Sequence, residues 1–412
     1  MSRIWHHGWA DDRRVQRGAL VVAGALALVF LVQVLGKAYR PQGYDLTSYL
    51  HSARALAAGR SPYNTGATFP YIYPMFTAMA LIPLAFAPYW LACVGWYAAT
   101  VGALVWSMRL ALGLHDAPRS GADQRRLLPP LVLLALLFLT PIQNNLLNGQ
   151  IDFVVLLLCL LFARAARDGR VLAAALFLGA AIATKLVPLI FVPFLLVRRR
   201  VGTLALALVA ATLLAFAPVI FLGTAIVPIY RDYLSLLAAH GQATAVQADI
   251  TYFTLDGAIR ALAPALAALL GPALRPAAAA AVMLPLVLAD LRLRRTGAVG
   301  DRWGTSLYLV AILLISPISE THHLAFLFPA IALVATPILL APRDARAGHW
   351  VIAATTYALL VAARRDATGP WAFAGIALLY CAMLAHTFRL PVHGWSSDAT
   401  SAPDLPTATG MA

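Results

Sequence analysis

The sequence predicts an all-α, polytopic membrane protein with about 10–13 membrane segments, each needing roughly 20 residues to cross a bilayer. Two observations carry this prediction. The 412 residues are 61% hydrophobic and only 12% charged, whereas soluble domains usually carry about 25% charged residues. Apolar runs of about 20 residues also recur along the whole chain, without the alternation typical of barrel strands. Because backbone groups in lipid must be satisfied internally, such runs are expected to form helices.

Basic residues indicate how these segments are oriented. The formal net charge is +14, and all but Lys37 and Lys185 of the 31 basic residues are Arg. Arg gathers in short loops between apolar runs, which the positive-inside rule places in the cytoplasm. We therefore interpret the charge as an orientation signal in a bacterial plasma membrane and expect no nucleic-acid partner. The polar segments then expected on the outer side are 37–70, 144–152, 224–275 and 319–323.

The expected apolar segments are 18–36, 71–87, 89–108, 128–147, 151–166, 171–184, 186–197, 201–223, 276–291, 304–318, 324–341, 349–363 and 370–388. The first is too long for a signal peptide and lacks a small-residue cleavage site, so it predicts an uncleaved span. We expect one membrane domain over 1–390. Residues 391–412 are rich in Ser, Asp, Thr and Pro and are expected to form a disordered cytoplasmic tail.

One stretch conflicts with this orientation. Two full crossings within 71–108 would put the Arg-rich loop 109–127 outside. Pro74, Pro83 and Pro88 interrupt the first half of the stretch. We therefore expect part of it to be re-entrant or to lie along the outer interface.

The segment YDLTSYLHSARALAAGRSPY, residues 44–63, follows the first span. We expect a juxtamembrane helix over 44–58, ended by Gly59. Asp45 at its start is either a catalytic carboxylate or a helix cap bonded to the Ser48 amide. The face expected to rest on lipid carries Leu46, Leu50, Ala53 and Ala57. The face expected to line a cavity carries Asp45, Tyr49, Ser52 and Leu56.

The stretch SPISETHHL, residues 316–324, contains Glu320, the single Glu of the chain, beside His322 and His323. Near neutral pH, His can donate to a phosphate, relay a proton or orient a carboxylate. Alternatively, the stretch is simply a polar loop between spans. Adjacent His side chains rarely share one face, so we expect one of the pair to point into a site. A zinc site would need further ligands at suitable spacing, and we find none, so no metal is expected.

Two further features carry polar groups. The turn NNLLNGQID, residues 144–152, offers Asn148, Gln150 and Asp152 as hydrogen-bonding groups suited to sugar hydroxyls, although a solvated hairpin turn would look the same. Lys185 lies within an apolar stretch, where a charge is costly and usually functional. Its partner would be a lipid phosphate, unless the side chain snorkels to the interface.

The order of these motifs resembles glycosyltransferase family 87 of the GT-C superfamily. An Asp-x3-Tyr-x9-Gly-Arg-x-Pro-Tyr pattern runs from Asp45 to Tyr63, followed by YIYPMF, NGQ, GAAIATKLVPLIFVPFLLVRRR and SPISETHHL. The resemblance covers most of residues 18–341, and its specificity lies in the order and spacing of short motifs. It implies a polyprenol-phosphate-mannose-dependent α-mannosyltransferase, a class whose best-known members extend phosphatidylinositol mannosides.

The resemblance also implies roles for individual residues. Asp45 would be the catalytic base and His322 or His323 would assist it, while Lys185 and Pro188 match a Lys-x-x-Pro motif. The donor would be a polyprenyl-phosphate sugar and the acceptor a glycolipid or glycan, with no cofactor. Because its lipid tail keeps the donor in the bilayer, transfer is expected at the extracytoplasmic membrane boundary.

Such a transfer needs few catalytic groups. One base deprotonates the acceptor opposite the leaving group, and the leaving phosphate needs cationic or hydrogen-bonding neighbours. The candidates for contact with the phosphate are Arg54, Arg60, Lys185, His322 and His323. The remaining candidates for substrate binding are Tyr49, Tyr63, Asn148, Gln150 and Glu320. The sequence shows no nucleotide-binding Gly loop and no Asp-x-Asp metal motif, as expected for a donor that is not a nucleotide sugar.

Two other functions remain open from the residues alone. A lipid or solute transporter, or flippase, would place ionisable groups near the bilayer midplane, often with repeat symmetry. Here the polar clusters gather on one expected side, which favours an interfacial enzyme. A non-catalytic membrane scaffold would leave the three polar clusters unexplained.

Overall fold

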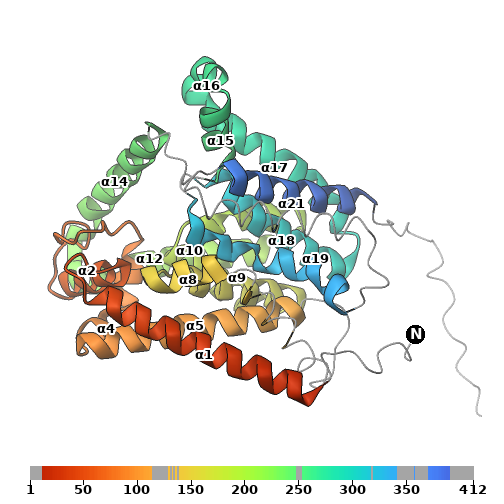
Figure 1. Ribbon diagram of the computed structural model, residues 1–412. Coiled ribbons are helices and arrows are strands. Elements are labelled where there is room, and N and C mark those ends of the chain that lie inside the picture. The colour runs from red at the N-terminus through yellow and green to blue at the C-terminus, as the bar shows by residue number, and fades with distance from the viewer. Residues whose placement is uncertain are drawn as a thin grey trace, which may run out of the picture.

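Figure 1 shows the computed structural model of the chain. The structure describes residues 12–113, 139–246, 253–316, 319–340 and 370–389, with isolated positions at 129, 132, 135, 136 and 357. Every regular element among these residues is a helix, which confirms the predicted all-α class. The tail 391–412 and, apart from 357, the expected span 349–363 lie outside the described residues.

The elements follow in chain order as α1 (Arg13–Ala38), α2 (Asp45–Ala57), α3 (Met75–Ala80), α4 (Ile82–Ala85), α5 (Tyr89–Gly113), α8 (Leu139–Asn148), α9 (Asp152–Arg167), α10 (Val171–Thr184), η2 (Val187–Ile190), α11 (Phe191–Val197), α12 (Val201–Phe216), α13 (Val219–Leu222), η3 (Gly223–Ala225), α14 (Ile226–Val246), α15 (Leu255–Leu262), α16 (Pro264–Leu270), η4 (Gly271–Ala273), α17 (Leu274–Leu293), α18 (Gly297–Ile315), η5 (Thr321–Leu327), α19 (Phe328–Leu340) and α21 (Pro370–Arg389). In Figure 1 helices α1 and α5 run side by side, with α2 at one end.

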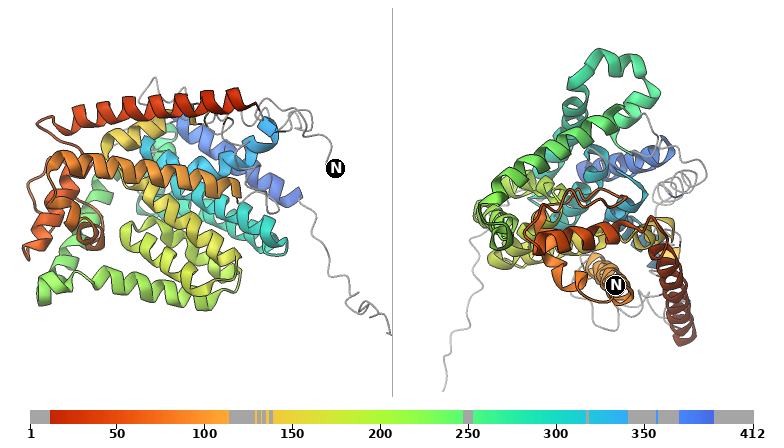
Figure 2. Two further views of the ribbon diagram at one scale, coloured as in Figure 1. Left: turned by 90° about the horizontal axis from the view of Figure 1, so that it is seen from below. Right: turned by 90° about the vertical axis from the view of Figure 1, so that its left-hand side faces the viewer.

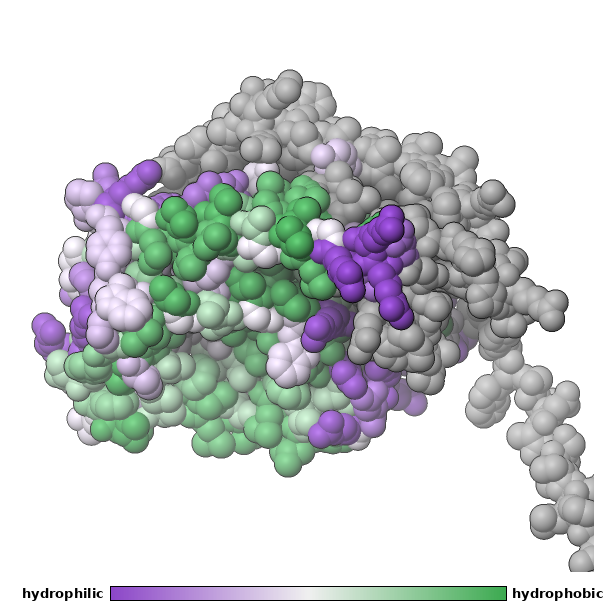
Figure 3. Space-filling view, turned by 60° about the horizontal axis from the view of Figure 1, so that its bottom comes forward, coloured by the Kyte–Doolittle hydropathy of each residue, from purple (hydrophilic) through white to green (hydrophobic). Residues whose placement is uncertain are grey.

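Several helices have the length and composition of membrane spans. Within the described residues, five are long and apolar enough to cross a bilayer, or up to six if the bent pair α8 and α9 forms one span. Shorter apolar helices cover Val171–Thr184, Val187–Val197, Thr321–Val334 and Phe373–Arg389. Figure 3 shows an apolar band across one face, with polar residues gathered at both ends of the band. The chain is therefore a polytopic membrane protein.

The Pro-interrupted stretch before α5 does not cross the membrane. Its two helices, α3 and α4, have six and four residues, and both pack beside α2. Ten helical residues span only about 15 Å, half of a bilayer core. Between residues 71 and 113, only α5 is therefore long and apolar enough to cross a bilayer. This agrees with the expectation of an interfacial segment.

Helix α2 is buried on both faces, so the expectation of a lipid-facing side is wrong. Leu46, Leu50 and Ala53 are at most 1% exposed, because α3 and α4 cover this helix. The helix begins at Asp45, and the residue that caps it is Tyr44, whose backbone N–H donates to the Thr47 hydroxyl at 3.2 Å. Asp45 is therefore not the helix cap, and its carboxylate is available for other contacts.

A sharp bend places the predicted polar turn beside α2. Helices α8 and α9 meet at 113° across the break between Asn148 and Asp152. Gly149 adopts a φ of +66° there, and a Cβ at this position would lie 2.7 Å from the Tyr44 ring. Only glycine permits both this left-handed backbone and this close approach. The turn therefore lies against the start of α2.

A buried ion-pair cluster joins helices at the opposite end of the molecule. Arg198, just after α11, contacts Asp290 of α17 at 2.6 Å and also Asp301 of α18. The side chains of Arg198 and Asp290 are 4% and 0% exposed. A Cβ on Gly304 would lie 2.7 Å from the Arg198 guanidinium. Glycine at 304 therefore leaves the space that this cluster occupies.

Removing one partner of this cluster should destabilise the fold. We expect Arg198→Met to lower the free energy of unfolding by about 3–5 kcal/mol, because Asp290 would keep a buried, uncompensated charge. The matched control is Arg164→Met, since Arg164 is 57% exposed and pairs with Asp168 at 3.7 Å. Its expected effect is below about 1 kcal/mol. Unfolding in detergent micelles measures both, and equal effects would contradict a structural role for the cluster.

Candidate functional site

Asp45 is held by an amide whose orientation is fixed. Gln150 accepts hydrogen bonds at Oε1 from the hydroxyls of Tyr73, at 3.1 Å, and Tyr49, at 3.3 Å. Its Nε2 therefore faces Asp45 and donates to Oδ2. Gln150 and both Tyr side chains are buried. This arrangement leaves Oδ1 of Asp45 as the carboxylate oxygen free of the Gln150 contact.

The environment of Asp45 favours a base that works near neutral pH. Burial raises the pKa of Asp45 to about 7, and the negative charges of Glu320 and Asp152 act in the same direction. Lys37 and Lys185 oppose this shift. Lys37, at the end of α1, donates to Oδ1 of Asn148. A carboxyl group with a pKa near 7 is a stronger proton acceptor, once ionised, than an ordinary Asp.

A second cluster gathers around Lys185, the residue that directly follows α10. Its Nζ lies 2.6 Å from Oδ1 of Asp152 and 2.8 Å from Nε2 of His323. The side chain of Lys185 is 12% exposed, and that of Asp152 is fully buried. Lys185 thus has a carboxylate partner within the protein, so the snorkelling interpretation is wrong.

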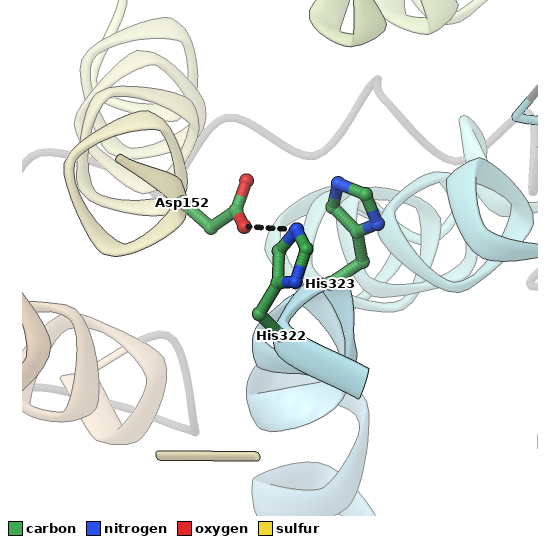
Figure 4. A group of neighbouring side chains, drawn as sticks. All are labelled: Asp152, His322 and His323. Carbon is green, nitrogen blue, oxygen red and sulfur yellow. Dashed lines mark ion pairs between the residues drawn. The ribbon is translucent and has the colours of Figure 1, made fainter. Parts of the chain in front are cut away.

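Both histidines belong to this cluster. Figure 4 shows His322 turned toward Asp152, with Nε2 3.8 Å from Oδ2, and His323 beside it. The ring centroids of the two His are 4.2 Å apart. Nδ1 of His323 accepts a hydrogen bond from the backbone N–H of Glu320 at 2.9 Å, while Nε2 on the other side of the ring contacts Lys185. The expectation that only one of the pair points into the site is therefore wrong.

Asp152, His322 and His323 also form a three-residue group able to hold a metal ion, since their ligand atoms lie within 4.8 Å of one another. Asp152 was not predicted as a third ligand, because it is distant from the His pair along the chain. The ammonium of Lys185, however, already contacts both Asp152 and His323. A metal ion bound here would have to displace that ammonium. The donor set therefore fits Lys185 better than a metal.

Three buried polar atoms, on His322 and on two residues of the neighbouring segments, form no hydrogen bond with the described part of the chain. Among the described residues, Oδ1 of Asn145, Oγ of Ser319 and Nδ1 of His322 have no hydrogen-bond partner. Asn145 and Ser319 are fully buried. Since buried polar groups are costly when unsatisfied, these atoms indicate a place where a polar ligand or water binds.

Tyr73 connects the two clusters. Its hydroxyl donates to Gln150, beside Asp45, while the Lys185 ammonium lies 5.6 Å from the centre of its ring. Asp45 also interacts electrostatically with Asp152, Glu320 and Lys185. The structure therefore brings the three polar stretches predicted from sequence into one site.

Three predicted substrate-binding residues lie elsewhere. Arg54 and Arg60 line a separate pocket with His51. Tyr63 stacks on Tyr233 with ring centroids 4.9 Å apart, and its hydroxyl donates to the carbonyl of Tyr73 at 3.2 Å. It therefore supports the loop that carries Tyr73.

Two other predicted substrate-binding residues do reach the site. Asn148 accepts a hydrogen bond from Lys37, and the Glu320 carboxylate lies 3.5 Å from Nδ1 of His322.

The sequence interpretation missed several members of the site. The residues without a predicted catalytic or binding role are Lys37, Tyr73, Asn145 and Ser319, and Asp152 was assigned only to sugar binding. Lys37 could have been found, because it is one of two Lys in an Arg-rich chain and follows the first span. The contacts of the other four depend on how distant helices pack.

The environment of Asp45 predicts a pH dependence. If Asp45 is the base, kcat/KM should fall about tenfold per pH unit below about pH 7, because the protonated carboxyl cannot accept a proton. An ordinary Asp would delay this fall to near pH 4. A pH–rate profile measures this fall in kcat/KM. The control variant Glu320→Gln should show the same fall as the wild type. A profile that stays flat down to pH 5 would contradict a raised pKa at the base.

The fixed amide predicts a second shift. Gln150→Glu should move the acid limb upward by about one pH unit or more, because a second carboxylate would face Asp45. Gln143→Glu is the matched control, since Gln143 is only partly buried and pairs with Gln33 through a solvent-exposed hydrogen bond of 3.0 Å. The pH–rate profiles of both variants are compared with that of the wild type, and only Gln150→Glu should shift the acid limb. Equal profiles would show that Gln150 does not act on Asp45.

Comparisons with known proteins show which family the chain is similar to. A family model described as glycosyltransferase family 87 matches residues 71–317. The match includes Gln150, Asp152 and Lys185, whereas Asp45 and the His pair lie outside it.

Two relatives are both described as polyprenol-phosphate-mannose-dependent alpha-(1-2)-phosphatidylinositol mannoside mannosyltransferases. The one from Mycolicibacterium smegmatis is 32% identical over 217 residues, which cover 48% of this chain and 48% of the relative. The one from Mycobacterium tuberculosis is 29% identical over 323 residues, which cover 72% of this chain and 71% of the relative. The match to the first thus spans about half of that protein's length.

Proposed function

The chain belongs to glycosyltransferase family 87, and we propose that it transfers mannose from a polyprenyl-phosphate donor to a mannosylated phospholipid on the extracytoplasmic face. Family membership confirms the glycosyltransferase class predicted from sequence. Donor and acceptor follow the names of the two relatives. The observation that carries the proposal is that Asp45, held by Gln150, shares one site with the Lys185–Asp152–His cluster.

Asp45 is the base of the proposed reaction. It takes the proton of the acceptor hydroxyl, whose oxygen then bonds to the anomeric carbon of mannose. The bond from that carbon to the phosphate oxygen breaks, and polyprenyl phosphate leaves with the electron pair. Gln150 donates to one carboxylate oxygen, so the other faces the acceptor. This step needs no further acid, because phosphate leaves as an anion.

Lys185 and His322 face the leaving phosphate in this proposal. Lys185 carries the cation of the second cluster, and Nδ1 of His322 is a buried nitrogen that accepts or donates no hydrogen bond among the described residues, although the Glu320 carboxylate lies 3.5 Å away. Asp152 holds the Lys185 ammonium at 2.6 Å. A cation placed in advance where negative charge develops lowers the barrier of such a reaction. Asp45 and this cluster would flank the sugar from opposite sides.

A membrane location suits a lipid-linked donor. The apolar band of Figure 3 is where the polyprenyl tail would lie. The site lies among α2, the α8–α9 bend and the end of α10, at the end of the molecule that carries the first outer segment. The positive-inside rule supports an extracytoplasmic position for this end.

The direct test uses the purified protein with radiolabelled polyprenyl-phosphate mannose and a phosphatidylinositol mannoside. We expect labelled acceptor and released polyprenyl phosphate in equal amounts. Polyprenyl-phosphate glucose serves as the donor control. Transfer of glucose alone would overturn the choice of mannose. Uptake of intact substrate into proteoliposomes without chemical change would instead support a transporter.

A further inference from the structure

We propose that a pocket at the C-terminal end of α2 binds the phosphate of a glycerophospholipid headgroup, on the opposite side of α2 from the transfer site. The pocket has a volume of about 390 Å³. Its lining offers two guanidinium groups, an imidazole, two hydroxyls and an amide, and it contains no carboxylate. The lining residues are His51, Arg54, Ala55, Arg60, Ser61, Asn64 and Thr65. This set of donors suits a phosphate diester, which presents anionic oxygens.

The two Arg side chains of the pocket are free to bind an anionic ligand. Nε of Arg54 donates to the carbonyl of Ala85 at 2.8 Å, which anchors the side chain at the pocket. Within the described part of the chain, neither Arg54 nor Arg60 forms an ion pair with a carboxylate. The guanidinium charges are therefore not neutralised by a described acidic neighbour. Arg commonly binds phosphate through paired N–H groups.

Exposed apolar side chains flank the pocket, which indicates a lipid rather than a free anion. Phe86 follows Ala85 and is 69% exposed. On the other side, a Cβ on Gly59 would lie 3.3 Å from the carbonyl of Phe221, so the end of α2 touches α13. Ile220 in α13 is 75% exposed. In a membrane protein such side chains contact acyl chains. The pocket can therefore bind a headgroup while the flanking apolar side chains contact the acyl chains of the same lipid.

Helix geometry separates this pocket from the transfer site. Arg54 follows Asp45 by nine residues, which in an α-helix corresponds to about 180° of rotation and roughly 14 Å along the axis. A leaving phosphate is bonded to the sugar that Asp45 helps to transfer, so it cannot lie on the far side of α2. The occupant of the pocket is therefore a phospholipid other than the sugar donor.

Native mass spectrometry of the full-length protein tests this inference. The probe is dioctanoyl phosphatidylglycerol, with dioctanoylglycerol, citronellyl phosphate and inorganic phosphate as comparison ligands. We expect Arg54→Gln with Arg60→Gln to weaken binding of the phospholipid at least about tenfold. Arg231→Gln, at an exposed position in α14, should leave it unchanged. Citronellyl phosphate, a short polyprenyl monophosphate, should bind the double variant as it binds the wild type.

Several results would overturn the inference. Equal phospholipid binding by wild type and double variant would exclude the pocket, and loss of citronellyl phosphate would make it the donor site. Inorganic phosphate bound as tightly as the phospholipid, through the same Arg residues, would make it a free-phosphate site. If the double variant unfolds, the single variant Arg60→Gln replaces it, and unchanged phospholipid binding in that variant would overturn the inference. Asp45→Asn should keep phospholipid binding, so failure of the proposed transfer is distinguishable from failure of this inference.

Discussion

Asp45→Asn should lower mannose transfer by about 10²–10⁴-fold, the usual contribution of a general base. The amide has nearly the shape of the carboxylate but cannot take the proton of the acceptor hydroxyl. Gln150 can still donate to the amide oxygen at this position, so the local structure should persist. The measurement is the rate of transfer at saturating donor, with thermal unfolding as a check on folding.

The matched control for this change is Asp232→Asn, because Asp232 is an exposed carboxylate in α14. It should transfer mannose at the wild-type rate. Wild-type activity in Asp45→Asn would remove Asp45 from the mechanism. Glu320, whose carboxylate lies 3.5 Å from Nδ1 of His322, would then be the next residue to test.

Lys185→Met should lower kcat by about 10²–10³-fold, the range found when one fixed electrostatic stabiliser is removed. The variant leaves the buried Asp152 carboxylate without its cation. Leaving-group charge would then develop beside an uncompensated negative group. The effect should therefore appear in kcat more than in the KM for the acceptor. Transfer kinetics with varied acceptor measure this split.

Chemical rescue distinguishes a catalytic role of the Lys185 charge from a role of Lys185 in folding. Lys185→Cys should be equally inactive, and alkylation with bromoethylamine should restore activity because it rebuilds an ammonium at the same reach. Alkylated wild type is the control, since Cys381 is exposed and also reacts. Failure of rescue in a folded, fully alkylated variant would contradict a role for the Lys185 charge in the reaction.

The fold class could be predicted from sequence because membrane helices leave a strong compositional signal. The interfacial character of the Pro-interrupted stretch was also predictable, since Pro74, Pro83 and Pro88 limit helix length. The burial of both faces of α2 was not predictable. Amphipathic periodicity shows which residues share a face, but it does not show that α3 and α4 fold back over the helix.

The site was predictable in part. Motif order indicated Asp45, Lys185 and the His pair, and the structure places all of them close together. The pairing of Lys185 with Asp152 depends on packing between α9 and α10, which a single sequence does not encode as a pattern. Arg54 was assigned to the phosphate from its charge alone, and the turn of α2 places it on the opposite side of the helix from Asp45.

The most direct test of the account is a structure of the protein with a non-transferable donor analogue, a polyprenyl phosphonate linked to mannose through carbon. We expect the phosphonate beside Lys185 and His322, with the anomeric carbon of mannose between that group and Asp45. A phosphonate bound beside Arg54 and Arg60, with the sugar remote from Asp45, would contradict the account.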